Sequence, residues 1–135
     1  MMKYFCCENH RREDVEKSDL NGIDYLEVLD DVTMPDDERQ FTLLVHFIKS
    51  LTGSGLNENN VRIEGGERVR NVAVKQVSIG ADDQDKVLTV KVDRRGDFSL
   101  YTFRLVKGIS LPHLPPDGFD RILSAVDFSF KVNCP

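Results

Sequence analysis

The segment Val126–Val132 alternates apolar and polar residues at every position. A period of two is the pattern of a β-strand that packs one face on a core and turns the other face toward water. The polar positions between the apolar ones, such as Asp127 and Lys131, would face the solvent. The segment therefore predicts a half-buried strand whose inner face carries Val126, Phe128, Phe130 and Val132.

Six further segments show a similar pattern and are separated by turn-forming residues such as Asn21-Gly22. In the longest of them the phase slips, and a β-bulge near Lys75–Gln76 would account for the slip. Strands at this spacing favour a sandwich over a parallel α/β sheet. We expect an all-β fold, an immunoglobulin-like (fibronectin III-like) β-sandwich of about seven strands. The predicted strands are 22–29, 41–48, 61–63, 69–79, 87–92, 100–106 and 126–132.

The connection before the last strand is rich in proline, with Pro112, Pro115 and Pro116. It predicts a long crossing loop, followed by one helical turn at 120–124. Tyr101, near the start of the sixth strand, has two interpretations. It is either the tyrosine corner of an immunoglobulin-like sandwich or an ordinary core tyrosine.

The first 19 residues differ from the rest of the chain. Residues 8–17 are almost wholly charged, which favours a short exposed helical turn that could not be stable alone. Tyr4 and Phe5 would have to anchor this arm. At 135 residues the chain has about the length of one domain. We therefore expect an N-terminal arm, 1–19, packed on a β-sandwich domain, 20–135.

Charge and hydropathy exclude two classes of partner. The chain has 18 Lys and Arg against 23 Asp and Glu, a net charge of -5, and each basic cluster has acids beside it. This distribution argues against nucleic acid, which usually selects a basic stripe. No segment approaches the ~18 apolar residues of a membrane span. The N-terminus also has no apolar region typical of a secretory signal, so we expect a cytoplasmic protein.

The chain has three cysteines, Cys6, Cys7 and Cys134, with His10 close to the first two. Together they have the ligand types of a zinc site, but adjacent cysteines point apart, and structural zinc sites usually space them by two to four residues. A disulfide to Cys134 would require the two ends of the chain to meet. In a reducing cytosol we expect free thiols, with no metal and no cofactor.

No catalytic set emerges from the sequence. A cysteine enzyme needs a base and a group that orients the base. The histidines are His10, His46 and His113, and nothing in the sequence orients any of them. We therefore predict that the chain is not an enzyme.

Several strings of the sequence together resemble the opening of the large baseplate assembly proteins of phage-tail-like contractile injection systems. The strings are Tyr4–Glu8, Leu20–Val28, Thr42–Phe47, Asn60–Gly66, Val126–Lys131 and Cys134–Pro135. The resemblance covers nearly all of this chain but only the N-terminal part of those longer proteins. It implies a structural β-sandwich module, part of a longer protein, that docks to other baseplate or tail proteins in a phage tail-like particle.

Two functions therefore compete, docking in assembly and binding of a ligand or glycan. An assembly module needs apolar residues on faces that would otherwise be solvated. The second faces of two predicted strands supply them as interface candidates: Leu44, Ile48, Leu100 and Val106. A glycan site needs exposed aromatic residues, and its candidates are Tyr4, Tyr25, Phe98 and Phe119.

Overall fold

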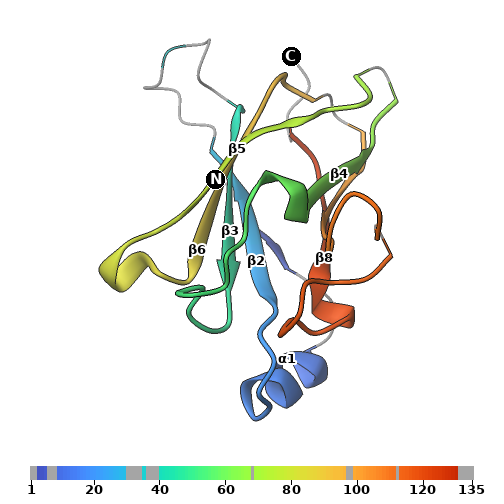
Figure 1. The fold of residues 1–135 in the computed structure, drawn as a ribbon. Helices are drawn as coiled ribbons and strands as arrows, with labels where there is room; N and C mark the ends of the chain where they lie inside the picture. The colour runs from blue at the N-terminus through green and yellow to red at the C-terminus, as the bar shows by residue number, and fades with distance from the viewer. Residues whose placement is uncertain are drawn as a thin grey trace.

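The computed structural model describes residues 3–5, 9–29, 35, 40–67, 69–96, 99–111 and 113–130. Eight strands within these ranges form two antiparallel sheets that pack face to face (Figure 1). The five-stranded sheet has the order β1-β2-β3-β6-β5, and the three-stranded sheet has the order β4-β7-β8. The strands are β1 (Lys3–Phe5), β2 (Ile23–Val28), β3 (Thr42–Phe47), β4 (Val61–Gly65), β5 (Val74–Ile79), β6 (Val87–Val92), β7 (Tyr101–Leu105) and β8 (Ala125–Phe128).

The sheet order confirms the predicted all-β sandwich. When β2 to β8 are taken as strands A to G, one sheet has the order ABED and the other has the order CFG. This is the strand order of constant-type immunoglobulin domains. The immunoglobulin-like assignment stays a prediction that the order supports. Besides the strands, the described ranges hold one α-helix, α1 (Asn9–Glu16), and three short 3-10 turns, η1 (Glu58–Asn60), η2 (Asp82–Gln84) and η3 (Ile122–Ser124).

All seven predicted segments contain a strand, and the structure adds β1, which pairs with β2 at one sheet edge. The predicted bulge is confirmed, because the register of β5 on β6 shifts between Val74 and Gln76. The predicted start of that strand at residue 69 is wrong. Asn71 has a φ of 57°, a left-handed conformation that an extended strand does not accommodate. Residues 131 and 132 of the last predicted strand lie outside the described residues.

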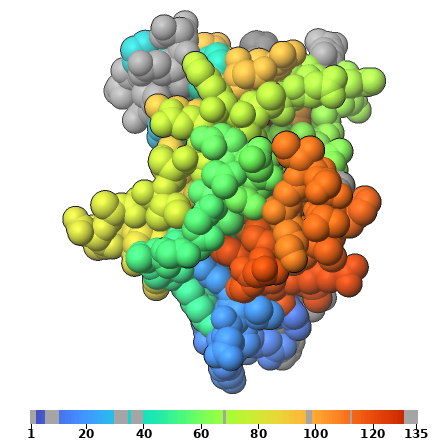
Figure 2. Space-filling view, viewed as in Figure 1, coloured from blue at the N-terminus to red at the C-terminus, as the bar shows by residue number. Residues whose placement is uncertain are grey.

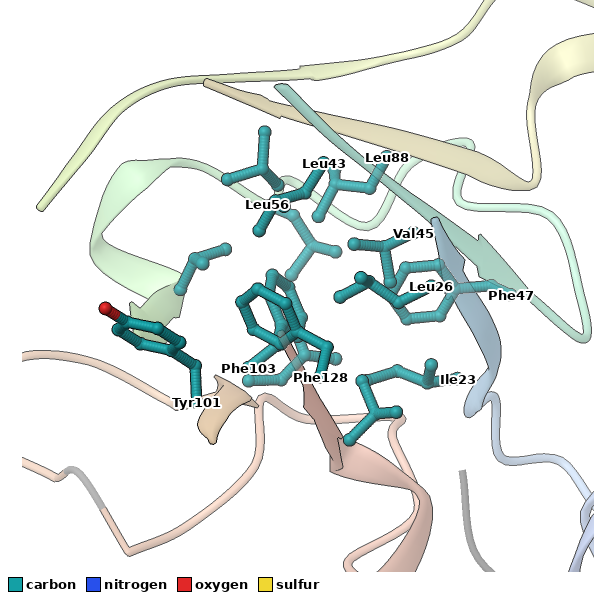
Figure 3. Close-up of a cluster of buried hydrophobic side chains, with 14 of the residues drawn as sticks. Ile23, Leu26, Leu43, Val45, Phe47, Leu56, Leu88, Tyr101, Phe103 and Phe128 are labelled. Carbon is teal, nitrogen blue, oxygen red and sulfur yellow. The ribbon is translucent and has the colours of Figure 1, made fainter. Parts of the chain in front are cut away.

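The core lies between the two sheets and is built from the inward residues of both (Figure 3). The predicted inner face of the last strand is confirmed for Val126, Phe128 and Phe130, which are all buried. Tyr101 is also buried, and its ring packs edge-on against Phe130. Its hydroxyl donates to the Val69 carbonyl oxygen, 2.6 Å away and 32 residues upstream. A tyrosine corner bonds only a few residues upstream, so Tyr101 is a core tyrosine with a long-range bond.

The predicted helical turn in the arm is α1, which lies at one end of the sandwich (Figure 1). Val15 is its only aliphatic residue and is buried in the core cluster. Tyr4 packs its ring on Phe128 and donates its hydroxyl to the Ser129 carbonyl oxygen at 3.2 Å. Phe5 does not anchor the arm in the core, because it is 66% exposed. The division into an arm and a domain at residue 20 stays a prediction.

Candidate docking surface

The four predicted interface residues occupy different environments. Leu100 is 64% exposed, and Leu44 is half-buried. Ile48 is also half-buried, but it packs against the core, since β3 ends at Phe47 and the alternation ends with it. The expectation that Val106 is exposed is wrong, because only 3% of it is accessible.

The four residues also do not form one surface. Val106 follows the end of β7, and its backbone N–H donates to the Asn60 carbonyl oxygen at 2.9 Å, which holds it inward. Leu100 precedes the other end of the same strand. Leu44 belongs to β3 in the opposite sheet, between the core residues Leu43 and Val45, and therefore faces outward. The interface role of Leu44 and Leu100 stays a prediction.

The outer face of the five-stranded sheet carries a row of rings that contact one another. Phe5 pairs in register with Tyr25, and Tyr25 pairs with His46. The Tyr25 and His46 rings stack with centroids 4.1 Å apart, and the Lys3 ammonium lies 4.9 Å from the Tyr25 centroid. His46 Nε2 lies 2.9 Å from Glu27 Oε1. These side chains already use one another as partners, and among the three rings only that of Phe5 is largely exposed.

The outer face of the three-stranded sheet is polar. Arg62 on β4 and Arg104 on β7 are directly opposite each other in the register. Both contact the carboxylate of Glu64, through Arg62 Nε at 3.4 Å and Arg104 Nε at 2.7 Å. On the other side of β7, the Thr102 hydroxyl donates to Asp127 Oδ1 at 2.7 Å. This is a solvated face held by its own ion pairs.

The connection between β7 and β8 carries the densest group of exposed apolar side chains. Ile109 is 81% exposed, Leu111 44% and Leu114 43%. We call these three residues the apolar loop. The segment that holds them forms much of the orange surface at the right of Figure 2. Ile122, farther along the same connection, is 52% exposed.

The apolar loop is fixed by backbone hydrogen bonds and by buried anchors. The Lys107 N–H donates to the Leu114 carbonyl oxygen at 2.7 Å, and the Leu111 N–H donates to the Gly108 carbonyl oxygen at 3.1 Å. Val106 is buried before the loop and Phe119 after it. The backbone of the loop is therefore held in a defined shape, with its apolar side chains exposed.

The rest of the same connection buries polar groups. Asp120 is fully buried, and its carboxylate accepts from the backbone N–H groups of Ile122 at 3.0 Å and Leu123 at 2.9 Å. The Arg11 guanidinium of α1 also bonds this carboxylate, through Nε at 3.1 Å and through Nη2. Burial alone would raise the pKa of Asp120, but the bonds from Arg11 and the backbone outweigh it and lower the pKa.

Asn21 also belongs to this group, and we call Arg11, Asn21 and Asp120 together the polar joint. The Asp120 N–H donates to the Asn21 carbonyl oxygen at 2.7 Å. The Asn21 side chain accepts from the Lys49 N–H at 2.9 Å and donates to the Lys49 carbonyl oxygen at 3.0 Å. The joint therefore ties the arm, the start of β2 and the turn after β3 to the end of the connection.

The chemical groups considered from the sequence lie partly outside the described residues. His46 lies on β3, whereas His113 lies in the connection between β7 and β8. Within the described ranges, no three His, Cys, Asp or Glu side chains are placed to hold a metal ion. Cys6, Cys7 and Cys134 lie outside those ranges, so their free-thiol state stays a prediction. In the same part of the chain, no helix is long and apolar enough to cross a membrane.

One family model matches the chain, that of the phage baseplate assembly protein, N-terminal domain, over residues 1–128. The chain belongs to this family. Membership confirms the resemblance predicted from the sequence, and it gives the domain a structural role in a phage baseplate, with other tail or baseplate proteins as partners. No curated protein and no solved structure matches the chain.

The apolar loop was missed by sequence reasoning. Its residues show neither the alternation of a strand nor the spacing of a helix, and the prolines around them indicate only a loop. The available signal was composition. A loop is expected to be polar, so Ile109, Leu111 and Leu114 in a proline-rich connection are themselves unusual.

Proposed function

We propose that this domain is a structural module of a phage-tail-like baseplate, in a contractile injection system, and that it docks to other baseplate proteins through the apolar loop. The observation that carries the proposal is the exposure of three branched apolar side chains on one short, hydrogen-bonded segment. Single exposed apolar residues are normal on protein surfaces, whereas a group of them marks an interaction site. Phe5 and Leu100 are also exposed, but each is separated in the sequence from the group formed by Ile109, Leu111 and Leu114.

A shaped loop suits this role for an energetic reason. A backbone that is already ordered loses less conformational entropy on binding, so more of the apolar burial contributes to affinity. Family membership supports a non-enzymatic role. The proposal adds to it a mode of contact, the insertion of Ile109, Leu111 and Leu114 into a partner.

The aromatic residues considered for glycan binding do not favour that alternative. Phe119 is buried, and its ring packs edge-on against Phe47. Tyr4 is half-buried and bonded to the Ser129 carbonyl oxygen. Tyr25 is stacked by His46 and approached by Lys3, so its ring faces are already used. Phe98 lies outside the described residues.

The test is a double substitution, Ile109→Ser with Leu111→Ser, in the protein as it is assembled. We expect the variant to fold like the wild type but to be depleted from purified baseplates by roughly tenfold or more, as for loss of an interface anchor. The measurement is its amount in purified particles, relative to a tail protein, by quantitative immunoblot. Thermal unfolding of the isolated variant reports on folding.

The matched control is Leu100→Ser, which removes a similarly exposed apolar side chain at the far end of β7. Docking through the apolar loop predicts that this variant enters baseplates normally, whereas the interface role predicted for Leu100 from the sequence would deplete it. Depletion of Leu100→Ser together with normal incorporation of the loop variant would reject the apolar loop as the docking site and would favour the surface around Leu100 instead.

A further inference from the structure

The arginine pair on the outer face of the three-stranded sheet is short of negative charge. Arg62 and Arg104 are direct cross-strand neighbours, an arrangement that is unfavourable for like charges. Among the described residues, one carboxylate, that of Glu64, contacts both. The Arg62 side chain is 52% exposed and the Arg104 side chain 42% exposed, so both guanidinium groups remain accessible to another molecule.

This pair is continuous with the apolar loop. Arg104 is followed by Leu105, the last residue of β7, and the connection that carries the loop begins at once. Lys107 lies in that connection and pairs with Asp117 at 3.3 Å, while Arg121 is exposed next to Ile122. Four cations therefore accompany the exposed apolar side chains, against the carboxylates of Glu64, Asp117 and Asp127. Asp127, farther along the face, is bonded to Thr102.

The local excess of positive charge contrasts with the whole chain, whose net charge is -5. We infer that the partner presents carboxylate groups beside an apolar cleft, so that the cleft receives the apolar loop while Arg62 and Arg104 bind the carboxylates. This inference rests on the proposed docking function and adds the chemistry of the partner surface. Guanidinium groups suit it, because they bind carboxylates in a planar, two-bond geometry.

A carboxylate from the partner would also relieve the arginine pair. It would supply a second negative charge, in addition to that of Glu64, which is the one carboxylate that contacts both guanidinium groups among the described residues. Charge complementarity of this kind speeds association and fixes the orientation of the partner more than it adds raw affinity. Docking should therefore weaken as the salt concentration rises.

The decisive variant exchanges the charges and keeps their pairing: Arg62→Glu and Arg104→Glu with Glu64→Arg. Position 64 would still carry the charge opposite to that of positions 62 and 104. We therefore expect the thermal unfolding of the variant to stay close to that of the wild type. Its incorporation into baseplates should fall roughly tenfold or more, because the partner's carboxylates would now meet carboxylates. If this variant does not fold, the neutral variant Arg62→Gln with Arg104→Gln decides, with a smaller loss expected.

The control is Lys91→Glu, which reverses an exposed cation on the outer face of the opposite sheet and should not change incorporation. Normal incorporation of the charge-exchanged variant, with depletion of the Ile109→Ser and Leu111→Ser variant, would overturn the inference and leave the proposed docking loop intact. Normal incorporation of both would overturn both. Binding of the wild-type domain to a duplex DNA probe at physiological salt, abolished by the exchange, would assign the arginine pair to phosphate and would also overturn the inference.

Discussion

The connection between β7 and β8 has two parts: the first exposes apolar side chains to the solvent, and the second buries a charged side chain. The apolar loop exposes Ile109, Leu111 and Leu114, whereas a few residues later Asp120 is fully buried. Both departures from the usual distribution occur within one connection, but they are stabilised differently. The buried carboxylate has a complete set of donors, from Arg11 and two backbone N–H groups. The exposed apolar groups leave 81%, 44% and 43% of their surfaces accessible, in the order Ile109, Leu111 and Leu114.

The difference separates a structural role from an interaction role. A buried charge is tolerated only when it is paired and hydrogen-bonded, so the polar joint belongs to the architecture of the domain. A group of exposed apolar side chains gains nothing from the solvent, and such groups often mark an interaction site. The same connection thus fixes its second part to α1 and β2, and under the proposed function it presents its first part to a partner.

The largest expected effect tests the structural side of this comparison. Asp120→Ala removes the acceptor of the Ile122 and Leu123 N–H groups and leaves Arg11 without its carboxylate. Buried donors that lose their acceptor are costly, so we expect a loss of about 3 kcal/mol in the free energy of unfolding. This corresponds to a Tm lower by roughly 10 °C for a domain of this size, measured by thermal unfolding.

The matched control is Asp117→Ala in the same connection. Asp117 is 90% exposed and pairs only with Lys107 among the described residues. Surface ion pairs contribute little, so the Tm should stay close to that of the wild type. If Asp117→Ala and Asp120→Ala lowered the Tm equally, the burial of Asp120 would have no special energetic role and the comparison would fail.

A smaller effect is expected from pH. The pKa of Asp120 is lowered in the folded state, chiefly because the donors from Arg11 and the backbone outweigh burial. Above the ordinary carboxyl pKa of about 4 the group is charged in both states, and its contribution to stability is complete. As the pH falls below that value, the unfolded chain takes up the proton first, and the contribution is lost as the pH passes through the folded pKa.

The measurement compares the wild type with Asp120→Asn, whose amide does not titrate. The difference between their free energies of unfolding should be constant from neutral pH to about pH 5 and should narrow below about pH 4. Asp93, whose pKa is also lowered, is present in both proteins, so its effect cancels. If the difference stayed constant at the lowest pH measured, the negative charge of Asp120 would not contribute to the free energy of unfolding.

The alternating pattern predicted most of the fold because it is a local signal with a strong physical cause. Each strand keeps its inward residues in the core, as Leu43, Val45 and Phe47 do on β3. The errors arise where alternation ends. The segment before Val74 turns at Asn71, and β1 is too short, with three residues, to show a period. Val106 is buried because its backbone is bonded to Asn60, a contact that no periodicity encodes.

The candidate docking surface was harder to predict, because it depends on contacts between distant segments. From the sequence, Leu44 and Leu100 looked alike, since both break the polar side of a strand. Only the structure shows that Leu44 is half-buried on one sheet and Leu100 exposed beside the other. Similarly, Arg62 and Arg104 become neighbours only through the pairing of β4 with β7.

The smallest expected effect tests the interaction side of the comparison. Ile109→Ser replaces a side chain that is 81% exposed, so it removes little buried apolar surface and leaves no cavity. The backbone bonds that shape the loop use Lys107, Gly108, Leu111 and Leu114 and do not involve Ile109. We therefore expect the free energy of unfolding to change by no more than about 0.5 kcal/mol, as for surface substitutions in general. Denaturant unfolding of the isolated domain measures this change. A loss comparable to that of Asp120→Ala would show that Ile109 stabilises the domain itself, and the apolar loop would then be part of the architecture and not a surface kept for a partner.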